Sequence, residues 1–106
     1  MAKLIELFYF EGCPSWERAL ENLEEAMKLE GVGTPVEKVL VTSGEDAKTE
    51  RFLGSPTIRI DGVDLDGPEA DKREFMFGCR IYPEGNETAG WPSIAVIRRA
   101  LQHAQG

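Results

Sequence analysis

The chain has 106 residues, 42% of them hydrophobic and 29% charged, which is typical of one small globular domain over residues 1–106. Its net charge of −7 argues against nucleic acid as a partner. The longest apolar runs are far shorter than the ~20 residues that cross a bilayer, which argues against a membrane partner. A strand-like run follows Met1-Ala2-Lys3 directly and leaves no room for a normal signal peptide, so we expect a cytoplasmic protein.

The first 41 residues predict a strand, a helix and a second strand. Residues 4–10 are almost continuously apolar, as in a strand that is covered on both faces. Pro14 suits a first helical turn, and the apolar spacing after it predicts an amphipathic helix of about four turns that ends near Gly31. The apolar residues of this helix are Trp16, Ala19, Leu20, Leu23, Ala26 and Met27. Residues 36–41 predict the second strand.

The middle of the chain predicts a short helix and a hairpin. Hydroxyl and acidic residues at 42–46 form a helix start, and Gly54 stops the helix that follows. Residues 57–60 alternate between apolar and polar and meet Asp61-Gly62, which is a strong hairpin signal. Residues 63–65 begin the returning strand.

The last third of the chain is less regular. Residues 66–77 predict a loop or a short helix, and residues 78–82 predict the last strand. Glycines, Pro83 and Asn86 predict a turn over 83–90, after which Pro92-Ser93 starts a final helix. The order β-α-β-α-β-β-α implies a parallel pair with a crossover helix plus an antiparallel hairpin. One mixed sheet with helices on both faces, an α/β fold, accommodates this order.

This order, with Cys13 after the first strand and Ser55-Pro56-Thr57 before the third, resembles the thioredoxin fold. The resemblance covers nearly the whole chain and implies a thioredoxin-like mixed four-stranded sheet, with a cis peptide bond between Ser55 and Pro56 facing Cys13. More narrowly, residues 8–14, 52–62 and 79–82 are similar to a group of small bacterial thioredoxin-like proteins. Some members of that group are loosely associated with alkylmercury lyase.

Cys13-Pro14-Ser15-Trp16 is a variant of the C-x-x-C motif in which Trp16 replaces the second cysteine. A cysteine at a strand-to-helix junction lies near the positive end of the helix macrodipole, which stabilises a thiolate. We therefore expect Cys13 to be a nucleophile; the alternative is a small buried hydrophobic residue. Trp16 either packs into the core or offers a stacking surface to a substrate. Ser15 donates a hydrogen bond to the thiolate, caps the helix or is simply exposed to solvent. The candidates for substrate binding are Ser15, Trp16, Ser55 and Pro56.

Cys79 is the candidate that would replace the missing resolving thiol. In a strand it shares a face with Ile81 and points away from Arg80, so Arg80 is a poor candidate for lowering its pKa. The alternative is a buried strand cysteine without a role. In a thioredoxin-like sheet the last strand runs toward the active-site end, which would place Tyr82 nearer that end than Cys79. Because a disulfide needs Cα atoms within about 7 Å, the geometry of a Cys13–Cys79 bridge looks stretched.

The sequence predicts no cofactor and no ordinary metal site. Asp61, Asp64 and Asp66 do not match the spacing of a calcium loop. Turn chemistry explains Asp61, and exposure to solvent explains the other two. His103 is the only histidine, so a Cys–His dyad is not expected. Two thiolates could still hold a soft ion such as Hg²⁺ or Cu(I), and this alternative stays open.

Two classes of function follow from these residues. The first is a thiol–disulfide oxidoreductase in which Cys13 attacks a protein or small-molecule disulfide, and in which Cys79 or an external thiol such as glutathione releases the product. The second is a binding module that keeps the fold without the chemistry and pairs with an extended peptide beside the proline loop, with Trp16 as an apolar contact. The residues specify neither the substrate nor the oligomeric state.

Overall fold

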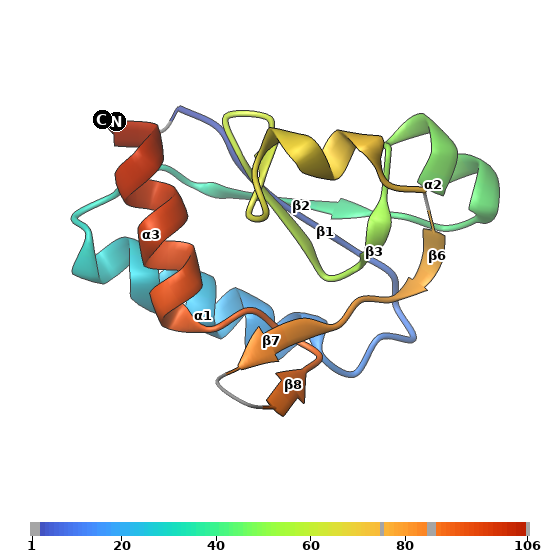
Figure 1. The fold of residues 1–106 in the computed structure, drawn as a ribbon, viewed down its shortest axis with the longest axis horizontal. Coiled ribbons are helices and arrows are strands. Elements are labelled where there is room, and N and C mark those ends of the chain that lie inside the picture. The colour runs from blue at the N-terminus through green and yellow to red at the C-terminus, as the bar shows by residue number, and fades with distance from the viewer. Residues whose placement is uncertain (1–2, 75, 85–86, 106) are drawn as a thin grey trace.

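The computed structural model describes residues 3–74, 76–84 and 87–105 (Figure 1). Its elements follow in the order β1 (Ile5–Tyr9), α1 (Trp16–Leu29), β2 (Val36–Leu40), α2 (Gly44–Thr49), β3 (Leu53–Ser55), β4 (Thr57–Ile60), β5 (Val63–Asp64), η1 (Pro68–Lys72), β6 (Met76–Cys79), β7 (Tyr82–Glu84), β8 (Glu87–Ala89) and α3 (Ile94–Gln105). None of the helices in these ranges has the length and apolar character that a membrane crossing requires.

Four strands form one mixed sheet in the order β2-β1-β4-β5. β1 is parallel to β2, as the crossover helix between them requires, and β4 is antiparallel to both β1 and β5. The turn between β4 and β5 is Asp61-Gly62, with φ values of 53° and 84°. Two positive φ values suit a tight hairpin turn, which explains this residue pair. The predicted α/β fold with a mixed four-stranded sheet is confirmed.

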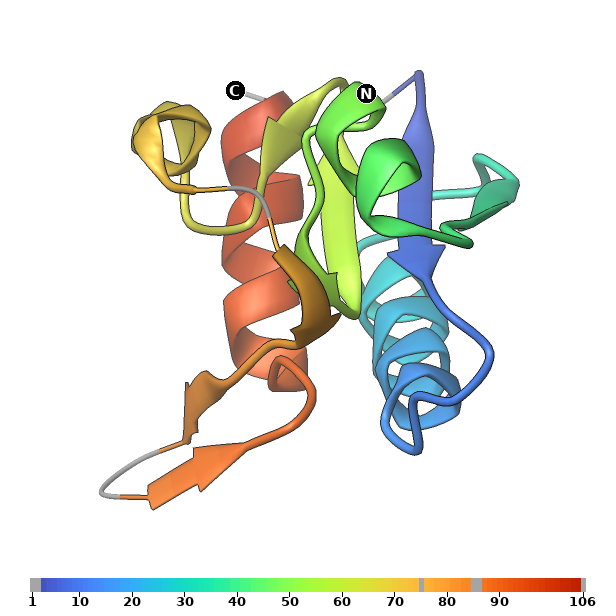
Figure 2. The ribbon, with the colours of Figure 1, turned by 90° about the vertical axis from the view of Figure 1, so that its right-hand side faces the viewer.

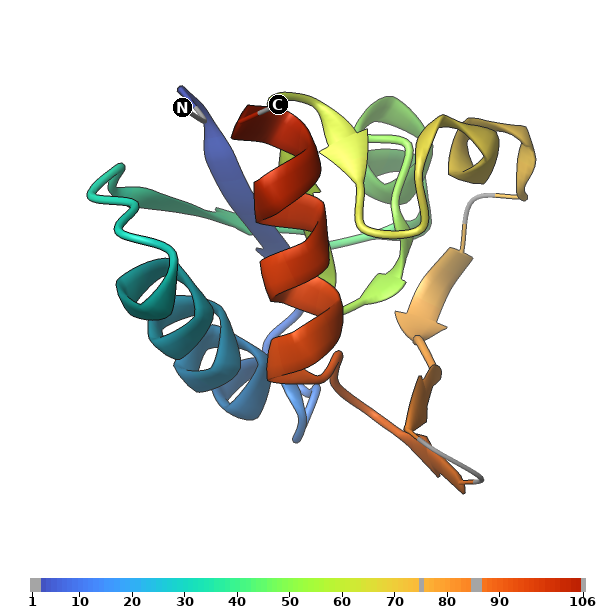
Figure 3. The same ribbon diagram turned by 60° about the vertical axis from the view of Figure 1, so that its left-hand side comes forward.

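Helices cover both faces of this sheet. α1 and α3 lie side by side on one face (Figure 3), where they pack on alternate residues of β1 and β4. The fully buried members of this core are Ile5, Leu7, Ala19, Leu23, Ala26, Ile58, Ile97 and Leu101. α2 covers the other face through a smaller cluster of Phe8, Val41, Ala47 and Phe52. The apolar run of β1 is therefore explained, because both of its faces are buried.

The segment after β5 differs from the prediction. Residues 78–82 do not form the last strand of the sheet; β5 has that place. The chain leaves the sheet at Gly67-Pro68 and makes the 3-10 turn η1, after which β6 pairs in parallel with β3 in a separate two-stranded sheet. β7 and β8 form a hairpin that projects from the body (Figure 2). Residues 85 and 86 of the predicted turn lie outside the described ranges.

Candidate functional site

Cys13 lies in the loop between β1 and α1, where its sulfur contacts the chain before Pro56. The helix begins at Trp16 with Ser15 as N-cap, later than Pro14 suggested, so Cys13 lies two residues before the cap. The Cys13 N–H donates to the Phe10 carbonyl over 3.1 Å, which closes a tight turn. The Cys13 side chain is only 4% exposed, and its Sγ donates to the Ser55 carbonyl oxygen over 3.7 Å.

Ser55 is the residue on which the site converges. The Ser55–Pro56 peptide bond is cis, as predicted. The Ser55 carbonyl accepts a second hydrogen bond, from the Arg80 N–H over 2.9 Å. Ser55 is completely buried, and its Oγ has no hydrogen-bond partner among the described residues. Such an unpartnered buried polar atom is rare in proteins and calls for an explanation, such as a role in chemistry or an ordered water.

Cys79 is the β6 residue that pairs with Ser55 in the β3–β6 ladder. Strands in a ladder lie about 4.8 Å apart, so the Cys79 backbone is a close neighbour of Ser55. The alternative of a buried strand cysteine is wrong, because the Cys79 side chain is exposed. The alternative of a resolving thiol stays a prediction, and the segment approaches Ser55 because it leaves the main sheet. Cys13 and Cys79 are both free thiols.

Side chains alternate in direction over residues 79–82. Cys79 and Ile81 are exposed, the latter by 70%, whereas Arg80 and Tyr82 are buried. The prediction that Arg80 points away from Cys79 is therefore confirmed. The direction of burial is unexpected, because the charged residue faces inward and the apolar Ile81 faces outward.

Arg80 is the centre of a buried polar cluster that sequence reasoning missed. Its two terminal nitrogens donate to the two carboxylate oxygens of Asp64, each over 2.7 Å. They also donate to Asp66 over 2.9 Å and to the Thr57 hydroxyl over 3.3 Å. Asp64 is buried, so the expectation that exposure explains this residue is wrong. The one sequence signal for this pairing is that Asp64 and Arg80 each lie in a short segment in which apolar and polar residues alternate.

The charges of this cluster shift the pKa values of its members. Burial alone would lower the pKa of Arg80, but its hydrogen bonds with Asp64 and the nearby negative charges outweigh burial and raise it. Burial likewise acts to raise the pKa of Asp66, yet Arg73 and Arg80 together hold that pKa below its usual range. The ionised forms of Arg80 and Asp66 are thus favoured near neutral pH.

Tyr82 connects the cluster to the proline loop. Its hydroxyl donates to the Pro56 carbonyl over 2.5 Å, and its ring lies under the Arg80 guanidinium at 4.7 Å from Cζ to centroid. Burial, partly offset by the Arg80 charge, raises the pKa of Tyr82. Tyr82 therefore remains a hydrogen-bond donor across the neutral range.

Trp16 and Ser15 serve the packing around the loop. Trp16 is the first residue of α1, and its ring stacks on Tyr9 with centroids 4.4 Å apart. It is half-buried and packs against the main core, as one of the two predictions has it. The Ser15 side chain makes no capping hydrogen bond. It lies so close to Gly90 that a Cβ at position 90 would be 2.3 Å from the Ser15 Oγ.

A recess of about 340 Å³ lies beside the two cysteine segments. Its lining includes Gly12, which precedes Cys13, and Phe77, which lies two residues before Cys79. The ring of Phe77 packs on that of Phe10 with centroids 5.2 Å apart. The other lining residues are Phe10, Glu11, Leu40, Val41 and Thr42, so the recess combines apolar residues with one acidic residue.

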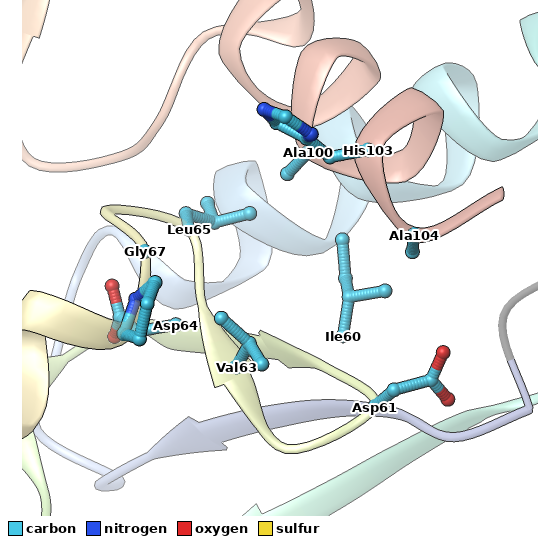
Figure 4. Close-up of a pocket in the computed structure, with 10 residues that line it drawn as sticks. Ile60, Asp61, Val63, Asp64, Leu65, Gly67, Ala100, His103 and Ala104 are labelled. Atoms are coloured by element: carbon cyan, nitrogen blue, oxygen red, sulfur yellow. The ribbon is translucent and has the colours of Figure 1, made fainter. Parts of the chain in front are cut away.

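The larger cavity, of about 480 Å³, lies at the opposite end of β4, between the β4–β5 hairpin and α3 (Figure 4). Apolar side chains of Ile60, Val63 and Leu65 line it, together with His103 of α3. It contains neither cysteine. Within the described ranges, no three or more His, Cys, Asp or Glu side chains come together in a way that could hold a metal ion.

The site thus joins a buried thiol, an exposed thiol and a cis-proline loop around one serine. We compared the chain with protein-family models, with curated proteins and with solved structures, and none of the three comparisons found a match.

Proposed function

We propose that this chain is a thioredoxin-like thiol–disulfide oxidoreductase whose redox pair is Cys13 and Cys79. The observation that carries the proposal is the meeting of both cysteine segments at Ser55. The Cys13 thiol contacts the Ser55 carbonyl, and Cys79 is paired with Ser55 across the β3–β6 ladder. Two cysteines that are 66 positions apart in sequence (79 − 13) therefore both adjoin one buried residue.

The backbone supports the thioredoxin-like part of the proposal. A strand, a crossover helix and a parallel strand come first, and an antiparallel hairpin then extends the sheet in the order β2-β1-β4-β5. Cys13 follows β1, and the cis bond before Pro56 immediately precedes β4. At both positions the chain also resembles the thioredoxin fold in sequence.

The proposed reaction exchanges disulfides in two steps. The Cys13 thiolate attacks one sulfur of a substrate disulfide, forms a mixed disulfide, and releases the other substrate sulfur as a thiolate. The Cys79 thiolate then attacks the Cys13 sulfur, which releases the second substrate thiolate and forms the Cys13–Cys79 disulfide. Two electrons pass to the substrate and two protons complete its thiols. An external dithiol or glutathione returns the protein to its reduced state.

Three features near the Cys13 segment bear on this chemistry. The Ser55 carbonyl can accept a hydrogen bond only from the protonated Cys13 thiol, so it orients that thiol before ionisation. The Ser55 Oγ is completely buried and has no hydrogen-bond partner among the described residues, so it could donate to a substrate sulfur only in a complex that exposes it. The apolar residues that line the recess beside Gly12 and Phe77 can receive the uncharged part of a substrate.

The difference in exposure favours a second order of events for bulky substrates. Cys79 is exposed, whereas Cys13 is 4% exposed, so a protein disulfide would meet Cys79 first. Cys13 would then resolve the mixed disulfide. Atoms and electrons balance in the same way in both orders.

A purely peptide-binding role is less well supported. An extended peptide would need free backbone groups beside the proline loop, but β6 pairs with β3 at that place and the Arg80 N–H occupies the Ser55 carbonyl. Trp16, the expected apolar contact, packs on Tyr9 and the core.

Intact mass after mild oxidation tests the proposal. We expect the reduced wild-type chain, treated with oxidised glutathione, to lose two hydrogens as a monomer and to retain no glutathione. Cys79→Ser and Cys13→Ser form a matched pair of variants, each of which should keep one glutathione on the remaining cysteine. The faster of the two adducts identifies the thiol that attacks first. Stable glutathione adducts on both cysteines of the wild-type chain, without an internal disulfide, would contradict the proposal.

A further inference from the structure

The segment that carries Cys79 has little backbone support. Among the described residues, β6 pairs only with β3, a strand of three residues, and the register shifts between the two paired positions. A two-stranded sheet is marginal in water by itself. Beyond Cys79, the backbone bond from Arg80 to Ser55 is the last contact of this ladder. Something besides the ladder must therefore hold Cys79 in place.

The Arg80 side chain provides a second attachment, to the main sheet. Arg80 is 5% exposed, and its bidentate ion pair joins it to Asp64, the last residue of β5. Its bond to the Thr57 hydroxyl adds a contact at the first residue of β4. The residue next to Cys79 is thereby tied to both strands of the β4–β5 hairpin.

Tyr82 repeats this attachment two residues later, through its hydroxyl bond to the Pro56 carbonyl. Because side chains alternate along an extended chain, burial of residues 80 and 82 forces residues 79 and 81 outward. Cys79 is exposed for this reason, while its backbone stays beside Ser55.

We propose that Arg80 is a positioning residue that holds Cys79 within reach of Cys13; the inference rests on the function proposed above. An apolar side chain at position 80 could fill the same space without desolvating a charge. A buried ion pair is weak support for stability, but its fork geometry fixes direction as well as distance. The two-pronged bond allows the guanidinium only one orientation against Asp64. Because Arg80 adjoins Cys79 in the chain, this also restricts the position of the Cys79 backbone.

The quantity that such positioning controls is the equilibrium of internal disulfide formation. The reduced chain plus oxidised glutathione gives the Cys13–Cys79 disulfide plus two glutathione thiols, and two electrons pass from the protein to glutathione. The equilibrium constant of this reaction measures how favourably the two thiols are held together. Loosening of the Cys79 segment lowers this constant.

The decisive variant combines Arg80→Met with Asp64→Asn. It removes both charges together, so no unpaired charge stays buried, and the asparagine amide keeps an oxygen that can accept from the Asp66 N–H. We expect the constant to fall by about tenfold to a hundredfold in this folded variant. Arg73→Met is the control, because Arg73 pairs with Asp66 in the same cluster but its side chain is 51% exposed. Its constant should stay within about threefold of wild type. A wild-type constant in the folded double variant would overturn the inference.

Arg80→Lys covers the case in which the double variant does not fold. Lysine keeps the charge but cannot make the two-pronged bond to Asp64. We expect an intermediate fall of the constant, and an unchanged constant would again overturn the inference. A fall by the same factor in Arg73→Met would also overturn it, because the effect would then reflect charge alone.

A nitroxide attached to Cys79 separates this inference from the proposed function. In a Cys13→Ser background, the label should be restrained by the intact Arg80 cluster and should gain mobility when Arg80→Met and Asp64→Asn are added. A wild-type chain that forms no internal disulfide would refute the proposed function, and the label would still decide the role of Arg80. Equal mobility in the two labelled chains would refute the positioning role.

Discussion

The molecule has two regions that are held together in different ways. The contacts around Leu23, where α1 and α3 pack on the sheet, are apolar. The contacts around Arg80, where the chain after β6 meets the β4–β5 hairpin, are ion pairs and hydrogen bonds. The first region buries many side chains that tolerate small shifts in direction. The second region depends on a few bonds with fixed angles. The comparison teaches that one part of the molecule determines whether the chain folds, and the other determines where Cys79 lies.

The largest effect is expected in the apolar region. Leu23→Ala creates a cavity in the fully buried core and should lower the free energy of unfolding by about 2–5 kcal/mol, measured by urea titration. Leu29→Ala is the same change on the same helix at a residue that is 52% exposed, and it should alter stability by less than about 0.5 kcal/mol. Similar losses in both variants would mean that the apolar core does not dominate stability.

Tyr82→Phe tests the polar region. The variant leaves the Pro56 carbonyl without its donor and should cost about 1–3 kcal/mol near neutral pH. The pKa of Tyr82 is raised in the folded state, so its contribution is complete below the unfolded value of about 10 and is lost as pH rises above it. The stability difference between wild type and variant should therefore shrink above about pH 10. Tyr9→Phe, whose ring stacks on Trp16, is the matched control. A difference that stays constant up to pH 11 would exclude this role for the hydroxyl.

Asp66→Asn probes the outer edge of the polar region. The folded-state pKa of Asp66 is lowered by Arg73 and Arg80 against the effect of burial, so its contribution is present above the unfolded value of about 4 and fades as pH falls through the folded value. Because the Asp66 side chain is 33% exposed, we expect a loss below about 1 kcal/mol at pH 7 and almost none at pH 2. Glu74→Gln, at an exposed acid nearby, is the control. A larger loss at pH 2 than at pH 7 would contradict the sign.

Ser55→Ala should have the smallest effect on stability. Its Oγ is buried without a partner among the described residues, so the variant should leave the free energy of unfolding unchanged or raise it by up to about 1 kcal/mol. Thr57→Val is the contrasting variant, because the Thr57 hydroxyl donates to the Gly54 carbonyl over 2.6 Å and its loss should cost about 1–3 kcal/mol. A marked loss of stability in Ser55→Ala would show that the hydroxyl has a partner in solution.

Local signals were sufficient to predict much of the framework. The apolar spacing of α1, the hydroxyl cap of α2 and the Asp61-Gly62 turn each depend on neighbours along the chain, and each appears in the structure. The Ser43 side chain accepts from the Asp46 N–H as a cap does. The cis bond before Pro56 could not be predicted from its neighbours alone, because only the place of Pro56 in the order of elements distinguished it from the other prolines.

The polar region could not be predicted in the same way. Alternation indicates that Cys79 and Ile81 share a face, but it does not say which face is buried. The usual preference for buried apolar residues would turn Ile81 inward, and the ion pair between Arg80 and Asp64 reverses this. That pair joins residues that are 16 positions apart, and it forms because the chain reverses direction through η1 and returns to the hairpin.

The contact between Ser15 and Gly90 has a consequence for sequence variation. With a Cβ at position 90 only 2.3 Å from the Ser15 Oγ, any larger residue there must displace the side chain that precedes Trp16. In a selection from libraries randomised at both positions, we expect alanine or serine at 90 to be recovered together with glycine or alanine at 15. The two segments, 75 positions apart (90 − 15), would then covary as if they were adjacent.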